Sequence, residues 1–84
     1  MTREEIRSAV LEALAAVAPE ADPASLDASA PLREQLDLDS MDFLNFVIGI
    51  HERTGAEIPE ADYAKLASLE HAVAYVEARC AGGG

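Results

Sequence analysis

The sequence predicts an all-α fold, a four-helix bundle with three longer helices, a short third helix and a long loop between helices one and two. Apolar residues recur three and four positions apart in the segments assigned to the longer helices, which is the spacing of one helix face. No segment shows the pattern of a strand. A chain of 84 residues has room for one core. We therefore expect one domain over residues 1–80 and a flexible, glycine-rich tail over residues 81–84.

The first helix is expected over Arg3–Val17. Thr2 and Glu5 have the spacing of a capping box, in which each side chain accepts the other residue's backbone N–H. One face of the segment stays apolar through Ile6, Val10, Ala13, Leu14 and Val17. Pro19 and Pro23 follow, and proline does not continue a helix.

The segment Ala18–Leu38 is expected to form the long loop. Aspartate, serine and proline, which favour turns, are frequent in it. A structureless loop of this length is uncommon in a compact domain. We therefore expect Leu26, Leu32 and Leu36 to hold the loop against the core, with a short helical turn over Pro31–Gln35.

Three further helices are expected after the loop. The second helix should span Ser40–Arg53, with Gly55 as its C-terminal stop. Pro59 precedes a short third helix near Glu60–Leu66. Ser68 is positioned to cap the fourth helix, whose apolar residues repeat at Leu69, Val73, Val76 and Cys80.

Composition and charge narrow the classes of function. The formal charge is −10, from 16 acidic and 6 basic residues, which argues against nucleic-acid partners and anionic membranes and favours basic protein partners. No apolar run approaches the ~20 residues of a membrane span, so no membrane insertion is expected. Met1–Glu5 lacks the pattern of a signal peptide. The single cysteine, Cys80, cannot form an internal disulfide, which fits a reduced, cytoplasmic protein. We expect a monomer.

The segment Leu36–Asp42 places one serine at the junction between the loop and the second helix. Asp39 is positioned to cap this helix and Asp42 lies in its first turn, where the helix dipole stabilises negative charge. Ser40 would then project from the first turn into solvent. An aspartate–serine pair alone is a weak signal, because many helices begin this way.

The helix that follows Ser40 has two apolar faces. One face is formed by Phe43, Phe46, Val47 and Ile50, and we expect it to face the bundle interior. The other face is formed by Met41, Leu44 and Ile48. A helix in a small domain needs to bury only one face, so we expect the second face to dock partner proteins.

The segment Pro31–Asp42 resembles the attachment region of acyl carrier proteins, whose serine carries a 4′-phosphopantetheine arm. The resemblance continues through Glu57-Ile58-Pro59 to Val76 and covers nearly the whole chain. It implies that Ser40, flanked by Asp39, accepts 4′-phosphopantetheine from coenzyme A. Acyl groups would then be carried as thioesters on the thiol of the arm. The protein would be a carrier rather than an enzyme.

The resemblance also implies which partners and surfaces are involved. The partners would be a phosphopantetheinyl transferase and acyl-loading and acyl-transfer enzymes with basic docking surfaces. The residues expected to contact partners are Met41, Asp42, Leu44, Asn45, Ile48 and Glu52. The residues expected to line an acyl pocket are Phe43, Phe46, Val47, Ile50 and Leu66.

Three departures from the family pattern favour a specialised carrier over one serving bulk fatty acid synthesis. Asn45 and His51 stand where carriers of fatty acid synthesis usually have acidic residues. Met41 replaces the commoner leucine, and Phe43 replaces a small residue of the acyl pocket. Phe43 and Phe46 together are expected to narrow that pocket and to favour cargo that is short, polar or held outside the bundle. Two alternatives stay open: an aminoacyl or peptidyl carrier (including D-alanyl carriers), and an unmodified interaction module on the same fold.

No metal site is expected. The aspartates around Ser40 do not match a calcium loop, because Asp42 stands where the loop needs glycine and Ile48 where it needs glutamate. His51 and His71 are far apart and have no ligand spacing around them, so we expect ordinary surface or half-buried histidines.

Overall fold

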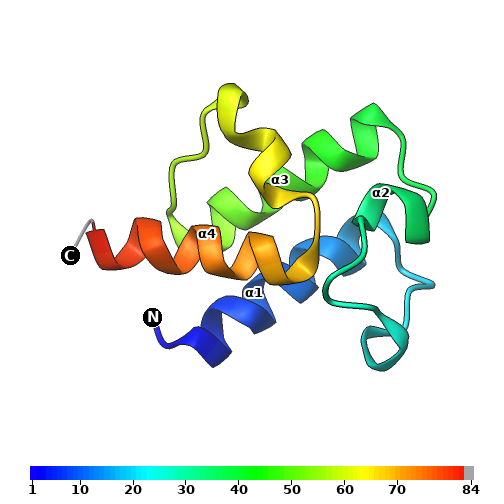
Figure 1. Cartoon of the computed structure of the whole chain (residues 1–84), viewed down its shortest axis with the longest axis horizontal. Coiled ribbons are helices and arrows are strands. Elements are labelled where there is room, and N and C mark those ends of the chain that lie inside the picture. Colours follow the sequence, from blue (N-terminus) through cyan, green and yellow to red (C-terminus); the bar gives the residue numbers. More distant parts are fainter. Residues whose placement is uncertain (83–84) are drawn as a thin grey trace.

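The computed structural model describes residues 1–82, which form helices and connecting loops without a strand. Three long helices account for most of the fold (Figure 1). Two elements, labelled η, are 3₁₀ helices. In chain order the elements are α1 (Arg3–Val17), η1 (Pro23–Ser25), α2 (Leu32–Gln35), α3 (Ser40–Thr54), η2 (Glu60–Leu66) and α4 (Leu69–Gly82). The predicted all-α bundle is confirmed, with its short third helix as the 3₁₀ helix η2.

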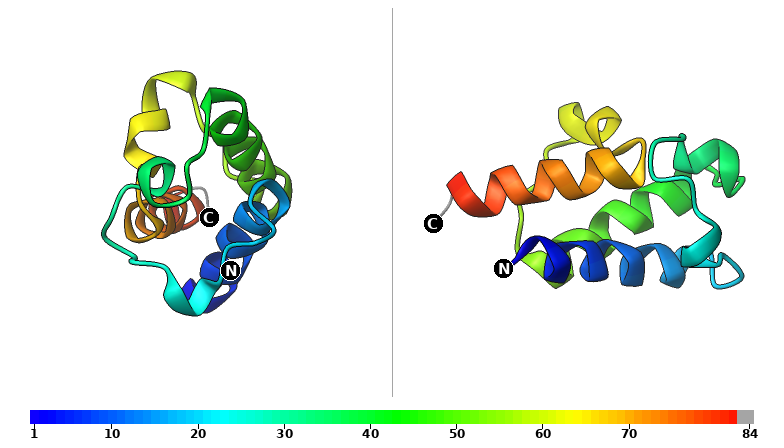
Figure 2. Two further views of the ribbon diagram at one scale, coloured as in Figure 1. Left: turned by 90° about the vertical axis from the view of Figure 1, so that its right-hand side faces the viewer. Right: turned by 60° about the horizontal axis from the view of Figure 1, so that its bottom comes forward.

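The long helices run back and forth along the longest axis of the molecule. α1 packs mainly along α3 and less extensively along α4, and η2 packs on α4. The N-terminus and the last turn of α4 lie at one end, whereas α2 and the start of α3 lie at the other (Figures 1 and 2). The junction that contains Ser40 is therefore remote from both ends of the described chain.

The core lies between the three long helices. Its large, fully buried side chains are Ile6, Val10, Leu14, Leu32, Phe46, Ile50, Leu66, Leu69 and Val76. Gly49 lets α1 and α3 approach closely, because a Cβ atom at this position would lie only 3.1 Å from the Cβ of Ala13. The C-terminal half of α3 is therefore packed tightly against α1 at Gly49.

Local signals set most helix ends. The predicted capping box is present at α1: the Thr2 hydroxyl accepts the Glu5 backbone N–H at 3.1 Å, and the Glu5 carboxylate accepts the Thr2 N–H at 2.8 Å. The hydrogen bond from the Thr2 N–H, with the nearby Thr2 hydroxyl, holds the pKa of the Glu5 carboxyl below its ordinary value. Gly55, at φ 74°, ends α3 one residue later than predicted. The Ser68 hydroxyl accepts the His71 backbone N–H at 3.1 Å, which confirms the predicted cap of α4.

The long loop is held against the bundle as predicted. Leu32 is fully buried, and Leu26 and Leu36 are half-buried against the core. Backbone bonds add to this, because Leu32 donates its N–H to the carbonyl of Ala67 at 2.7 Å. The Gln35 side chain then crosslinks the loop, accepting the Asp27 N–H at 3.1 Å and donating to the Asp27 carbonyl at 2.9 Å. The loop is therefore an ordered support for α2.

The C-terminal part of α4 extends further than the sequence indicated. The helix continues through Gly82, two residues into the segment predicted as a tail. The rest of that predicted tail, residues 83–84, lies outside the described residues. Within the described part of the chain, no helix is both long enough and apolar enough to cross a membrane.

Candidate functional site

Ser40 is the first residue of α3 and is exposed. Asp39 caps this helix as predicted, since its carboxylate accepts the Asp42 backbone N–H at 2.7 Å. The Asp42 carboxylate accepts the Asp39 N–H at 3.4 Å, which completes a capping box. Because the aspartates satisfy the helix end, the Ser40 hydroxyl has no capping role and is available for chemistry.

A tight turn directly before Asp39 positions α2 beside the start of α3. Asp37 has φ 53°, in the left-handed region, and the Leu38 N–H donates to the Arg33 carbonyl at 3.0 Å. This is the bond of a Schellman motif, in which a left-handed residue follows the helix and the next residue closes the turn. Leu38 is buried. The turn reverses the chain so that α2 and the first turn of α3 face each other.

Arg33 contacts Ser40 across this turn, a contact that the sequence does not indicate. The Arg33 Nη2 atom lies 3.4 Å from the Ser40 Oγ atom. The Arg33 guanidinium carbon also lies 5.9 Å from the centre of the Phe43 ring, within the range of a cation–π contact. A basic side chain therefore adjoins the serine within a strongly acidic protein.

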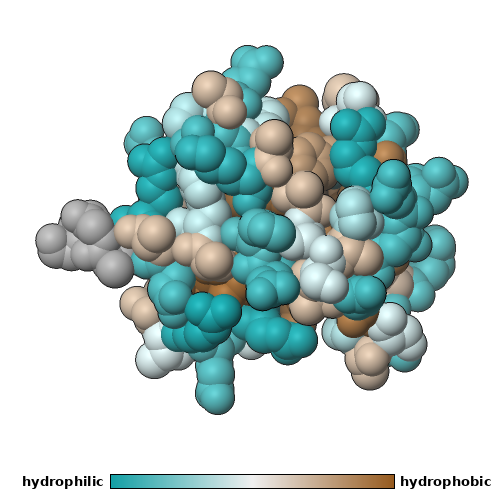
Figure 3. Space-filling model, viewed as in Figure 1, coloured by the Kyte–Doolittle hydropathy of each residue, from teal (hydrophilic) through white to brown (hydrophobic). Residues whose placement is uncertain are grey.

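A groove of about 550 Å³ begins beside Ser40 and runs between α3 and η2. In Figure 3, apolar surface lies between η2 and the N-terminal half of α3, with hydrophilic surface around it. The groove is lined by Arg33, Ser40, Phe43, Leu44, Glu60, Tyr63 and Ala64. The three η2 residues could not be predicted from the sequence, because a seven-residue 3₁₀ helix has no motif that indicates which of its sides faces α3.

The five residues predicted for an acyl pocket do not line one common cavity. Phe43 lines the groove beside Ser40, whereas Phe46, Ile50 and Leu66 are fully buried in the core. Val47 lines a second hollow of about 470 Å³ on another part of α3. The Phe43 and Phe46 rings pack together, with centres 5.9 Å apart. The two packed rings thus lie between the groove and the interior of the bundle.

The residues predicted to contact partners all reach the surface. Met41 and Ile48 are among the exposed large hydrophobic residues, at 63% and 43% exposure. Asn45 and Glu52 are exposed, and Asp42 and Leu44 are half-buried. The surface of α3 therefore carries apolar side chains among polar and acidic ones, beginning next to Ser40.

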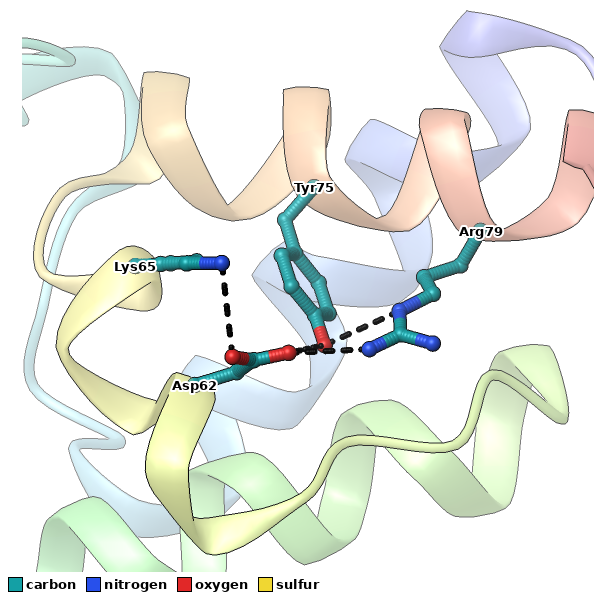
Figure 4. A network of polar contacts seen from close by, with 4 residues as sticks. All are labelled: Asp62, Lys65, Tyr75 and Arg79. Carbon is teal, nitrogen blue, oxygen red and sulfur yellow. Dashed lines mark hydrogen bonds and ion pairs between the residues drawn. The ribbon is translucent and has the colours of Figure 1, made fainter.

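A polar network attaches the η2 wall of the groove to α4 (Figure 4). The Tyr75 hydroxyl and the Arg79 Nη2 donate to one oxygen of Asp62, at 2.7 Å and 2.8 Å. Lys65 pairs with the other oxygen at 3.4 Å. The hydrogen bond from Tyr75, with those from the two cations, holds the pKa of Asp62 below its ordinary value. The network fixes η2, and with it one side of the groove.

The described residues contain no group of three or more histidine, cysteine or acidic side chains that could hold a metal ion. His51 and His71 are both exposed and make local contacts. The Nδ1 atom of His51 lies 2.8 Å from the Ala56 carbonyl, and that of His71 lies 2.6 Å from the Ser68 hydroxyl. Each histidine thus contacts a residue close to it in the chain.

Comparison with known proteins decides the family. The model of the family described as "Phosphopantetheine attachment site" matches residues 6–76. The acyl carrier protein of Campylobacter hominis is 36% identical over 74 residues, covering 88% of this chain and 87% of the relative. The chain belongs to the acyl carrier protein family. The acyl carrier protein of Rubrobacter xylanophilus is 34% identical over 76 residues, covering 90% and 93%.

Acyl carrier proteins bear a 4′-phosphopantetheine prosthetic group, are modified by a phosphopantetheinyl transferase, and act as carriers for acyl-handling enzymes rather than as enzymes. The residues of this acyl carrier protein fit such a group. The Ser40 hydroxyl is exposed and free of a capping role, and an apolar groove with a basic side chain at its edge begins beside it. A long, partly apolar arm with a charged phosphate at its base matches these features.

Proposed function

We propose that this acyl carrier protein is modified with 4′-phosphopantetheine at Ser40 and carries acyl groups for the enzymes of a dedicated lipid or secondary-metabolite pathway. The observation that carries the assignment of Ser40 is its position. It is exposed at the first residue of α3, its helix end is capped by Asp39, and the groove starts beside it. The group, when bound, supplies a thiol that holds acyl groups as thioesters.

The other serines are less suited to modification. Ser68 is buried and caps α4. Ser25 and Ser29 donate their hydroxyls to nearby aspartates at 3.1 Å and 2.8 Å, in turns of the long loop. Ser8 lies in the middle of α1, away from any helix start. Of the five, only Ser40 combines exposure, a helix start and a flanking aspartate.

The residues around Ser40 supply recognition rather than catalysis. An unactivated serine hydroxyl is a weak nucleophile, so the transferase must supply the base that activates it. Asp39 holds the start of α3 in place. The apolar face formed by Met41, Leu44 and Ile48 would contact the transferase and later the acyl-handling enzymes, with Asp42 and Glu52 offering charge to their basic surfaces.

Modification of Ser40 is tested by incubating the unmodified protein with coenzyme A and a broad-specificity phosphopantetheinyl transferase. We expect the intact mass to rise by one arm and the modified peptide to contain Ser40. Ser40→Ala should remove the addition, whereas Ser8→Ala, the matched change at another exposed serine, should leave it intact. Addition to Ser40→Ala, or an arm mapped to another serine, would refute the assignment.

The proposal of a specialised pathway rests on the interior of the bundle. Phe43 and Phe46 pack together where a long acyl chain would have to enter, and overpacking a core costs ~1–3 kcal/mol. We therefore propose that the cargo is short, polar or held in the surface groove. Asn45 and His51, which replace acidic residues usual in carriers of fatty acid synthesis, point the same way.

The cargo proposal is tested by loading acyl groups of increasing length onto the modified protein. We expect core methyl NMR signals and the melting temperature to change little with chain length in the wild type. In Phe43→Ala, longer chains should shift the core signals and raise the melting temperature. Equal, progressive stabilisation in both proteins would overturn the proposal.

A further inference from the structure

Arg33 is the basic residue that lies beside Ser40. Arg3 pairs with Glu77 at 2.9 Å, and Lys65 and Arg79 pair with Asp62. Within residues 1–82, Arg7, Arg33 and Arg53 have no carboxylate at ion-pair distance. Arg53 donates to the Gly49 carbonyl at 3.2 Å, whereas Arg33 contacts the Ser40 hydroxyl. The place of Arg33 in the fold suggests an anion other than a carboxylate.

The contacts of Arg33 fix where its N–H groups point. The guanidinium lies over the Phe43 ring, 5.9 Å from the ring centre. One face of the guanidinium is therefore covered by the aromatic ring. Its Nη2 lies 3.4 Å from the Ser40 Oγ atom, a long and therefore weak hydrogen bond. An Arg33 N–H donor thus lies beside the Ser40 oxygen to which the arm would be attached. The hydrogen bond that it makes with this oxygen is weak.

A phosphate on Ser40 would use these donors far better. A guanidinium presents parallel N–H groups that match two phosphate oxygens. Around Ser40 lie the carboxylates of Asp39 and Asp42, which pair with backbone N–H groups of the helix start, so the dipole of α3 is already engaged by these side chains. A further negative group, attached to Ser40, needs a cation to balance it, and Arg33 is the cation beside Ser40.

We propose that Arg33 binds the phosphodiester at the base of the arm on Ser40 and so directs the arm into the groove that Arg33 borders. The inference rests on the proposed modification of Ser40. Arg33 acts as a positioning residue, because it holds the arm and takes no part in forming the thioester. The cation–π contact with Phe43 keeps the guanidinium in place in both the free and the modified protein.

The test is NMR of the modified protein, with Arg33 side-chain N–H signals and the amide signals of an isotope-labelled arm as readouts. Adding the arm should shift the Arg33 Nε–H signal and slow its exchange with water. In Arg33→Gln, the arm signals should become sharper, as expected for a less restrained chain. Arg33→Lys should be intermediate, because lysine keeps the charge but not the paired donors. Arg7→Gln removes the same charge from an exposed part of α1 and should match the wild type.

An Arg33 signal that does not respond to the arm, or arm signals equally sharp in wild type and Arg33→Gln, would overturn the proposal. Failure of the arm to add to Ser40 would instead refute the proposed function. The pairing between Arg33 and a phosphate is then tested in a protein that has phosphoserine at position 40. By ³¹P NMR, the titration midpoint of that phosphate should be lower in the wild type than in Arg33→Gln by about 0.2–0.7 pH units. Equal midpoints would overturn the proposal independently of the arm.

Discussion

At the scale of single residues, the geometry around Ser40 depends on the left-handed turn at Asp37. An L-residue in this conformation costs up to ~1–2 kcal/mol, and aspartate tolerates it better than most. The turn closes through the bond from Leu38 to the Arg33 carbonyl. It therefore brings α2, and Arg33 with it, to the start of α3.

We predict that Asp37→Val destabilises the protein by about 1–2 kcal/mol, because a β-branched residue resists a positive φ. Asp37→Gly should be neutral or stabilising by up to about 1 kcal/mol. The measurement is urea unfolding followed by circular dichroism. Asp37→Asn, which removes the charge and keeps the tolerance for this conformation, is the control. If Asp37→Val matched Asp37→Asn in stability, the turn would not be strained as described.

The sequence predicted the serine of the site but not the arginine beside it. Ser40 and Asp39 are adjacent in the chain and form a recognisable helix start. Arg33 lies seven residues earlier, and its contact with Ser40 exists only because Asp37 adopts a positive φ. A single-residue conformation of this kind leaves little trace in a sequence when the residue is not glycine.

At the scale of elements, α3 buries one apolar face and leaves apolar side chains exposed on the other. Adjacent residues show the division, since Val47 is buried whereas Ile48 is 43% exposed. The two faces were predictable from apolar spacing alone. The bounds of α1 were also predictable, because a capping box and two prolines delimit it. The 3₁₀ character of η2 was not, since seven residues are too few to distinguish the two helix periods.

We predict that Ile48→Ser changes the free energy of unfolding by less than about 0.5 kcal/mol, while slowing transfer of the arm from coenzyme A. Val47→Ala should cost about 1–3 kcal/mol through lost burial and a residual cavity, with little effect on the transfer rate at a temperature where the variant is folded. Urea unfolding and a timed intact-mass assay give the two quantities. An Ile48→Ser protein that unfolds as readily as Val47→Ala would contradict the assignment of the faces.

The attachment of η2 to α4 predicts a pH-dependent stability. The Tyr75 hydroxyl, with Arg79 and Lys65, holds the pKa of Asp62 below its ordinary value of 3.8. A carboxyl group with a lowered folded-state pKa stabilises the fold above its unfolded pKa, and this contribution is lost as pH falls through the folded pKa. The gap in melting temperature between wild type and Asp62→Asn should therefore be constant near neutrality and shrink below about pH 4.

Tyr75→Phe provides the matched control for this prediction. It removes the hydroxyl that donates to Asp62 and keeps the ring, so its gap to the wild type should also narrow in acid. A gap between wild type and Asp62→Asn that persists unchanged well below pH 4 would show that the carboxylate contributes nothing to the attachment of η2.

At the scale of the whole molecule, most of the negatively charged side chains have no positively charged partner within the described part of the chain. Within residues 1–82, ion pairs engage only two acidic residues, Glu77 and Asp62, out of 16 in the chain. The remaining carboxylates repel one another across a surface with principal extents of 34 × 26 × 20 Å. Such self-repulsion destabilises a compact state.

We predict that sodium chloride at moderate concentration, or magnesium ions at millimolar concentration, raises the melting temperature at neutral pH, because ions screen the repulsion. Differential scanning fluorimetry across a salt titration is the measurement. The increase should become smaller when the titration is repeated near pH 5, where part of the acidic charge is neutralised. A melting temperature that is flat or falls with salt would mean that the charges are balanced locally.

The protein isolated from its native cells shows whether Ser40 bears the arm and whether that arm carries acyl groups. Intact-mass and peptide mass spectrometry report the modification and the cargo together. We expect an added 4′-phosphopantetheine bearing an acyl group on the peptide that contains Ser40, and no addition in Ser40→Ala. An unmodified Ser40, or an arm attached elsewhere, would contradict the proposed attachment at Ser40. An aminoacyl or peptidyl cargo on Ser40 would contradict the acyl assignment.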